Sequence, residues 1–259
     1  MRTVVIWVVL VVLFVAFSKF LAAQPQAQAS QTDESFWLPM LSQFIPILVL
    51  FLVFVVFLRR AQTKNLLATQ GVALMSQGRY AEALEKFEQY RGANPKEAPG
   101  AFNLGVAKLC LWKLEGAADD LKAAEQLGGH KVASLVTLLP EHLALTLALL
   151  SDQAGARRSL AALPAGKGDA GRVALAEAIL LARAGSWSEA RRRLGSYESK
   201  QLAGSIGALS RAVDAMCVES LTGELRHVDR IALFGETGPQ ELRKAWPELV
   251  AFVERAPAS

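Results

Sequence analysis

The chain has 259 residues, of which 52% are hydrophobic and 20% are charged, and its formal net charge is +4. This composition fits a globular domain with added membrane-spanning residues and excludes an intrinsically disordered chain, which would have few hydrophobic residues. Because the basic residues are spread along the chain, we expect no nucleic-acid partner. Cys110 and Cys217 lack the paired spacing of a metal or redox site, so we interpret both as small buried apolar side chains.

The amino-terminal part contains two long apolar stretches, residues 4–17 and 37–58. A helix of about twenty residues crosses a hydrocarbon core of about 30 Å, which the second stretch satisfies directly and the first satisfies with Lys19 reaching toward the interface. Arg59 and Arg60 follow the second stretch, whereas the loop before it is acidic. We therefore expect a transmembrane hairpin in the inner membrane of a bacterium, with everything after residue 59 in the cytoplasm.

An alternative is that residues 1 to about 30 form a cleavable signal peptide, because the first apolar stretch is short and alanine-rich spacings follow it. The second stretch and its basic flank would still place the rest of the chain in the cytoplasm. No proline or glycine occurs between residues 58 and 71, so we expect the helix to continue across this segment. The expected boundaries are 1–22 for the first helix or signal peptide, 23–35 for the extracytoplasmic loop and 36–60 for the second helix.

A spacing pattern in residues 71–95 recurs thirty-four residues later. The paired positions are Gly71 and Gly105, Leu74 and Lys108, Tyr80 and Leu114, Ala83 and Ala117, Phe87 and Leu121, and Tyr90 and Ala124. The alanine series continues at Ala156 and Ala190, so its spacings are 34, 39 and 34 residues, with the extra residues expected between 128 and 140. Small residues at such positions let helices approach closely, and this period predicts stacked helix pairs in an α-solenoid.

The first copy of the pattern resembles the tetratricopeptide repeat (TPR) family. The residues at the characteristic positions of that family are Gly71, Gly78, Tyr80, Ala83, Phe87 and Pro95. The resemblance implies antiparallel helix pairs that bind ligands on a concave side formed by the first helix of each pair. In the second copy, Trp112 stands where the family usually has glycine.

The expected fold is all-α, because no stretch has the two-residue alternation of a strand. We expect the transmembrane hairpin to be followed by about four to five TPR-like helix pairs within residues 61–200. A degenerate repeat and a C-terminal capping helix are expected over 201–259, with helices at 206–221, 225–234 and 239–254. Such a cap would cover the last apolar face of the stack.

Residues 1–60 also resemble the membrane anchor of the membrane-bound AAA+ zinc metalloproteases. The matching features are RTVVIW at residues 2–7, WLP at 37–39, a later proline at 46 and a basic exit. The chain contains neither a phosphate-binding loop of that family nor an HExxH motif, so the resemblance implies at most a shared membrane partner.

No combination of residues indicates catalysis. His130, His142 and His227 have no metal-ligand spacing from one another or from a cysteine. The glycine-rich residues 164–171 lack the spacing of a phosphate-binding loop and are interpreted as a connection between repeats. We therefore expect a protein that is not an enzyme and that has no cofactor, no metal and no small-molecule substrate.

Binding of a protein partner is the function that the sequence favours. By position in the repeats, the concave groove is expected to be lined by Val72, Met75, Phe102, Asn103, Val106 and Leu109. This mostly apolar set suits an amphipathic or hydrophobic segment of a partner, held by burial at about 25 cal/mol per Å². The lysines and asparagines of TPR domains that bind chaperone tails are absent apart from Asn103.

Three alternatives stay open at this point. The terminal helix of the chain itself would fill the groove in one of them, and in another the groove positions are core residues. In the third, the protein is an assembly or regulatory subunit of a membrane complex that is recognised through its transmembrane hairpin. The favoured interpretation is a membrane-anchored cytoplasmic TPR scaffold.

Overall fold

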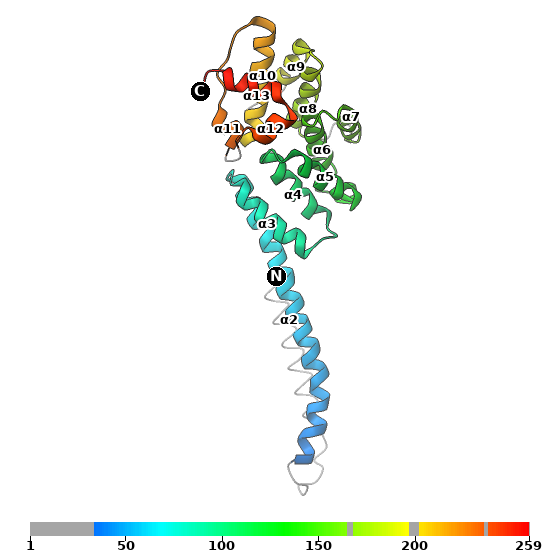
Figure 1. Cartoon of the computed structure of the whole chain (residues 1–259). Helices are drawn as coiled ribbons and strands as arrows, with labels where there is room; N and C mark the ends of the chain where they lie inside the picture. The colour runs from blue at the N-terminus through cyan, green and yellow to red at the C-terminus, as the bar shows by residue number, and fades with distance from the viewer. Residues whose placement is uncertain (1–33, 165–167, 197–201, 236–237, 259) are drawn as a thin grey trace. The chain divides into compact units, whose positions relative to one another are not determined.

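The computed structural model describes residues 34–164, 168–196, 202–235 and 238–258, and Figure 1 shows their arrangement. The helices are α2 (Glu34–Ser76), α3 (Tyr80–Ala93), α4 (Ala98–Cys110), α5 (Leu114–Gln126), η1 (Gly129–Lys131), α6 (Leu138–Leu149), α7 (Gln153–Ala161), α8 (Ala170–Arg183), α9 (Trp187–Gly195), α10 (Gly204–Thr222), α11 (Arg230–Phe234), α12 (Gln240–Ala245) and α13 (Pro247–Arg255). Within these ranges no strand forms beyond an isolated bridge between Val228 and Ala258. The all-α fold class is therefore confirmed.

The chain divides into two compact units, Met1–Arg59 and Arg60–Ser259. Helix α2 contributes residues to both units and runs without interruption, as expected from the absence of proline and glycine between residues 58 and 71. Among the residues that the structure describes, no helix combines the length and the hydropathy that a membrane crossing requires. The expected first helix or signal peptide (1–22) and residues 23–33 of the expected loop (23–35) lie outside the described residues, and α2 begins at Glu34, two residues before the expected second helix.

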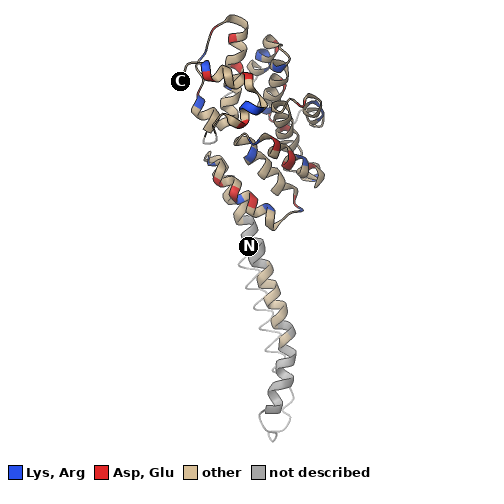
Figure 2. Cartoon of the chain, in the orientation of Figure 1, with Lys and Arg blue, Asp and Glu red and all other residues tan. Residues whose placement is uncertain are grey.

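The second unit is a solenoid-like stack of helix pairs, in which α4 packs on α5, α6 on α7 and α8 on α9. Charge separates the two helices of each pair (Figure 2). The first helices α4, α6 and α8 contain five charged residues together, whereas their partners α5, α7 and α9 contain eleven. The apolar first helices therefore face the interior of the stack, and the second helices face solvent.

The turns within the pairs share one backbone conformation. Gly78, Trp112, Ser151 and Gly185 each have a left-handed φ, at 75°, 58°, 63° and 76°. Their spacings are 34, 39 and 34 residues, the same series as the alanines. Glycine adopts this conformation without a steric penalty, but Trp112 and Ser151 adopt it despite their β-carbons, so the turn is imposed by the packing of the pair. The longer spacing includes the long connection 127–137 between α5 and α6, where the insertion was expected.

The small residues of the repeat pattern lie where helices touch. Four alanines of the series are completely buried: Ala83, Ala117, Ala156 and Ala190. A methyl group added at Gly105 would lie 2.8 Å from Leu121 Cγ and 3.2 Å from the carbonyl oxygen of Ala117, and one at Gly71 would overlap the ring of Phe87. The prediction that these glycines and alanines mark close helix contacts is confirmed.

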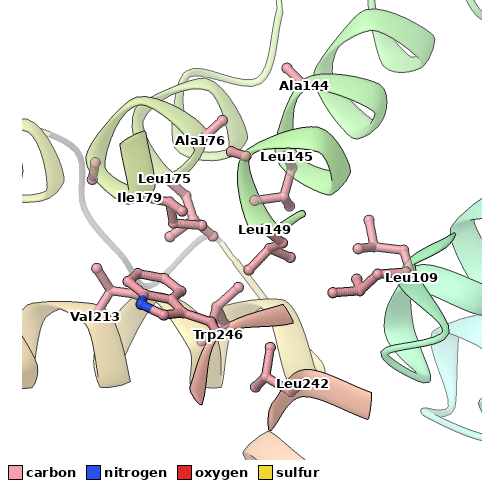
Figure 3. Close-up of a cluster of buried hydrophobic side chains, with 14 of the residues drawn as sticks. Leu109, Ala144, Leu145, Leu149, Leu175, Ala176, Ile179, Val213, Leu242 and Trp246 are labelled. Carbon is pink, nitrogen blue, oxygen red and sulfur yellow. The ribbon is translucent and has the colours of Figure 1, made fainter. Parts of the chain in front are cut away.

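The largest core cluster joins the later pairs to the C-terminal helices (Figure 3). Leu145 and Leu149 of α6 meet Leu175 and Ile179 of α8, and Trp246 closes the cluster from the segment between α12 and α13. A separate small cluster, built around Phe87, holds α3 against α4 and the end of α2. The first pair is thus attached to the stack by fewer apolar side chains than the later pairs.

The C-terminal helices differ from the expected ones. Helix α10 matches the expectation for 206–221. The helix expected over 225–234 is limited to α11, because the residues before α11 are not helical and Val228 forms a β-bridge with Ala258. The helix expected over 239–254 is divided into α12 and α13 at Trp246, whose φ and ψ of −144° and 75° are non-helical. Pro247 explains the break, since proline disfavours helical geometry in the residue before it.

Arg183 and Trp112 attach the C-terminal helices to the pairs through hydrogen bonds of their side chains. The Nη2 atom of Arg183 donates to the carbonyl oxygens of Leu149 at 2.6 Å and of Ala245 at 2.7 Å, and its guanidinium lies 4.6 Å from the ring centre of Trp246. These contacts satisfy carbonyls at the ends of α6 and α12. The Nε1 atom of Trp112 donates to the carbonyl oxygen of Leu233 in α11 at 2.7 Å.

Candidate functional site

The inner side of the helix stack contains a cavity of about 530 Å³. Its lining comes from α2, α4, α6, α8 and α10, which are successive first helices, together with Tyr80 at the start of α3. This volume lies within the range of ligand sites in proteins, about 300–1,000 Å³. The cavity exists because five apolar helices are placed side by side, so no single repeat could form it.

The floor of the cavity is apolar and rigidly packed. Leu109 of α4 and Leu145 of α6 line it while being 0% exposed to solvent. The walls are formed by partly exposed apolar side chains of α2, α4 and α10, which are Met75, Val106 and Ile206. Because the lining also contains polar groups such as His142 and Arg172, a ligand that enters would meet carbon and polar surface in comparable amounts, which suits an amphipathic occupant.

Three of the six residues expected to line the groove meet in this cavity: Met75, Val106 and Leu109. Val72 is 54% exposed on α2 and is not part of the lining. Phe102 is 6% exposed and packs edge-on against the ring of His142, with ring centres 5.3 Å apart. Asn103 is half-buried and lies outside the lining. The positions taken from the first two repeats thus divide between a cavity wall and other faces of α2 and α4.

His142 is a lining residue that the sequence reasoning did not assign to the site. Its Nδ1 atom lies 2.7 Å from the carbonyl oxygen of Leu138. Because a carbonyl only accepts hydrogen bonds, Nδ1 carries the proton, and Nε2 is left as an acceptor. Burial, with a smaller effect of Arg172, lowers the pKa of His142 to about 4, so the ring is neutral at neutral pH.

Arg172 contributes the charged group of the lining, and two carboxylates hold it. Its Nε donates to Glu141 Oε2 at 3.0 Å, and its Nη2 lies 2.9 Å from Asp169 Oδ2. The carboxylate of Glu141 is also fixed by the backbone N–H of Asp169, 2.6 Å from Oε1. Since two carboxylates face one guanidinium, the cavity presents no net positive charge to an anionic ligand. The ion pair with Glu141 attaches the start of α8 to α6, whereas the pair with Asp169 lies within the first turn of α8.

The opposite wall is formed where Tyr80 meets the start of α10. The hydroxyl of Tyr80 lies against Gly204, where any side chain would overlap it and where φ is 61°. Burial raises the pKa of Tyr80, so the phenol keeps its proton and remains a potential donor. Glycine is required at this position because both the close contact and the backbone conformation exclude a β-carbon.

The cysteines and histidines show no arrangement for catalysis among the described residues. Cys217 is buried, whereas Cys110 is half-buried and lines the cavity. Burial raises the pKa of the Cys110 thiol to about 12, which keeps it protonated and unreactive. No group of three or more potential metal ligands occurs within the described residues.

No protein-family model, no curated protein and no solved structure matches the chain. The residues and the geometry of the cavity therefore carry what is proposed below.

Proposed function

We propose that this protein is a membrane-anchored scaffold of the tetratricopeptide repeat type, which holds an apolar or amphipathic segment of a protein partner in its inner cavity. One observation carries the proposal: five successive first helices converge on a cavity with a fully buried leucine floor. Repeat proteins use such concave surfaces to bind extended or helical segments of other proteins.

The TPR assignment is supported by the regular turns of the stack. A left-handed residue recurs at 78, 112, 151 and 185, and a buried alanine follows each of them five residues later. The same backbone conformation at both glycine and non-glycine positions indicates one repeated structural unit rather than four unrelated helix pairs. An α-solenoid of this kind agrees with the fold described above.

The chemistry of the cavity supports an apolar occupant with a polar backbone. Each leucine- or phenylalanine-sized side chain buried against the partly exposed Met75, Val106 and Ile206 would contribute about 1.5–3 kcal/mol. The neutral His142 supplies an acceptor at Nε2, and Tyr80 supplies a hydroxyl, so an amide of an inserted segment has partners. The described C-terminal helices α11, α12 and α13 do not line the cavity, which speaks against occupation by the chain's own terminal helix.

A membrane anchor at residues 4–17 and 37–58 is supported by composition and by side-chain exposure. In 37–58 the structure describes the side chains of Ile45 and of 48–57, and all except Val55 are exposed. Leu50 is 70% exposed and Phe57 is 67% exposed. Such a continuous apolar surface is unfavourable in water and favourable in hydrocarbon. The basic residues after position 58 support a cytoplasmic location of the repeats, at the inner membrane.

The test is affinity capture of partners by the full-length protein from solubilised membranes. Val106→Glu and Met75→Glu each introduce a charge into the cavity at a partly exposed position, so the fold tolerates them better than a charge at buried Phe102. Ile231→Glu, at a position that is 87% exposed and outside the cavity, is the matched control.

Wild type and Ile231→Glu are expected to capture the same partner, and both cavity variants are expected to lose it. Circular dichroism checks that all three variants keep the helix content of the wild type. Undiminished capture by folded Val106→Glu and Met75→Glu variants would contradict the cavity as the docking site.

A second candidate function is recognition through the transmembrane hairpin, as an assembly or regulatory subunit of a membrane complex. The exposed apolar surface of α2 at 48–57 favours it, because a helix in the bilayer can pack against a partner helix there. Replacing residues 1–58 by an unrelated transmembrane hairpin distinguishes the two candidates. Capture that survives the replacement supports the cavity, and capture that is lost supports the hairpin.

A further inference from the structure

The second helices of the pairs separate positive from negative charge along the stack. Helix α5 has four acidic residues and one lysine, for a net charge of −3, and α3 has three glutamates and two basic residues, for −1. Helix α7 has two arginines and no acidic residue, for +2, and α9 has three arginines and one glutamate, also for +2. We call α3 with α5 the acidic surface and α7 with α9 the basic surface; Figure 2 colours their charges.

Several charges on each surface form no ion pair with any residue that the structure describes. Among the described residues, no ion pair joins Arg157 or Arg192 to a carboxylate, and both are exposed. The carboxylates of Asp119 and Glu125 are also exposed and form no ion pair with a described residue. By contrast, Asp120 is paired with Lys108 at 2.6 Å. The surfaces thus offer unneutralised charges of opposite sign to an external partner.

The basic surface also has an apolar hollow, of about 400 Å³, between α7, α8 and α9. Leu160, Leu180 and Leu181 line it together with Arg157 and with Arg193, which is paired with Glu177. An apolar centre surrounded by charged groups is the usual composition of a protein–protein interface. None of these residues lines the inner cavity, so the two sites do not overlap.

We propose that a second copy of this chain docks its acidic surface on this basic surface. When the charges already held in ion pairs within the molecule are left out (Glu82, Asp120, Arg191 and Arg193), the two surfaces carry net charges of −2 and +2, so one copy complements another without a further component. A two-fold axis places the acidic surface of each copy on the basic surface of the other and makes every contact twice. Because the attraction is between exposed charges, it orients the partners and weakens as salt is added.

Charge-reversal variants of the full-length protein test the proposal by sedimentation equilibrium in density-matched detergent. The acidic surface is reversed by Asp119→Lys with Glu125→Lys, and the basic surface by Arg157→Glu with Arg192→Glu. Glu224→Lys, at an exposed position after α10 that belongs to neither surface, is the matched control.

The wild type and the control are expected to dimerise at about 50 mM salt, with a dissociation constant that rises at least about tenfold at about 500 mM. Each reversed variant alone is expected to weaken the dimer by about tenfold or more, because four favourable charge pairs per dimer become repulsive. A mixture of the two reversed variants is expected to form heterodimers. The variant with all four substitutions is expected to dimerise again with roughly the wild-type affinity.

The mixing experiment separates a lost interface from a lost fold, because a misfolded variant has no affinity to regain. A wild type that stays monomeric at low salt would overturn the proposal. So would association that is insensitive to salt and to both reversals, which is the behaviour of a dimer formed by the membrane hairpin. Folded reversed variants that stay apart on mixing would overturn it as well.

Discussion

Acidification is expected to destabilise this protein through His142. The ring lies in α6 and is 9% exposed, its Nδ1 donates to the carbonyl oxygen of Leu138, and burial lowers its pKa to about 4. In the unfolded chain the same ring has the ordinary pKa of about 6.5. Because the folded value is the lower one, the unfolded state takes up a proton first as the pH falls. Stability is therefore complete above about pH 6.5 and is lost progressively down to about pH 4.

The size of the effect follows from the difference between the two pKa values. A difference of about 2.5 pH units corresponds to about 3 kcal/mol in the free energy of unfolding when the loss is complete. At about pH 5 the unfolded state is protonated and the folded state is still neutral, so about 2 kcal/mol is lost. This is a large part of the free energy of unfolding of a single domain, which is typically about 5–15 kcal/mol.

His142→Asn isolates this contribution, because the side-chain amide of asparagine has a donor at the position of Nδ1 for the Leu138 carbonyl and does not titrate. Urea unfolding of the full-length protein in mild detergent, followed by circular dichroism, gives the free energy of unfolding at about pH 7.5 and about pH 5. Other titrating groups are common to both proteins and cancel in the comparison. The wild type is expected to lose about 2 kcal/mol more than the variant over this interval. Equal losses, or a titration of His142 near pH 6.5 by nuclear magnetic resonance, would refute the reasoning.

Three further predictions test the packing. Gly105→Ala is expected to lower the free energy of unfolding by about 1–3 kcal/mol, since the methyl group would lie 2.8 Å from a leucine of α5. Gly92→Ala, in open space on α3, should instead raise the free energy of unfolding by about 0.5–1 kcal/mol. A higher melting temperature for Gly105→Ala would contradict the close contact. Trp112→Phe should lower it by about 1–3 kcal/mol in urea unfolding, because a buried carbonyl of α11 loses its donor, and an unchanged midpoint would show that the bond is dispensable. Glu141→Ala should destabilise by about 3 kcal/mol and Glu141→Gln by less, because glutamine keeps an acceptor for the guanidinium of α8; equal losses measured by thermal unfolding would argue against the ion pair.

The first helix pairs were predictable because their signals are local. The alanine series at 83, 117, 156 and 190 and the turns before it depend on how two neighbouring helices touch, and that contact needs small residues at fixed offsets. The continuity of α2 was predictable for the same reason, since it depends only on the absence of proline and glycine. Inference from local sequence is weaker at Trp112, because packing holds this tryptophan in the left-handed backbone conformation that usually requires glycine.

The site was predicted only in part, because a groove is formed by faces that meet across the stack. Phe102 and Val106 lie one helical turn apart on the same face of α4, so periodicity alone predicts that both line the groove. The structure places Val106 in the cavity wall and buries Phe102 against His142. The C-terminal segment was misjudged at Trp246 for a related reason, since a proline that is compatible with a helix start divides what reads as one amphipathic helix.

By itself, the sequence determined the all-helical class, the period of the helix pairs and which residues let the helices come close, because these follow from backbone sterics and from contacts between chain neighbours. Only the tertiary structure decided that five first helices share one cavity, that His142 and Arg172 stand in its lining and that opposite charges separate onto two outer surfaces. Those features depend on how successive pairs are rotated against one another, and that rotation is set by the packing of the whole stack.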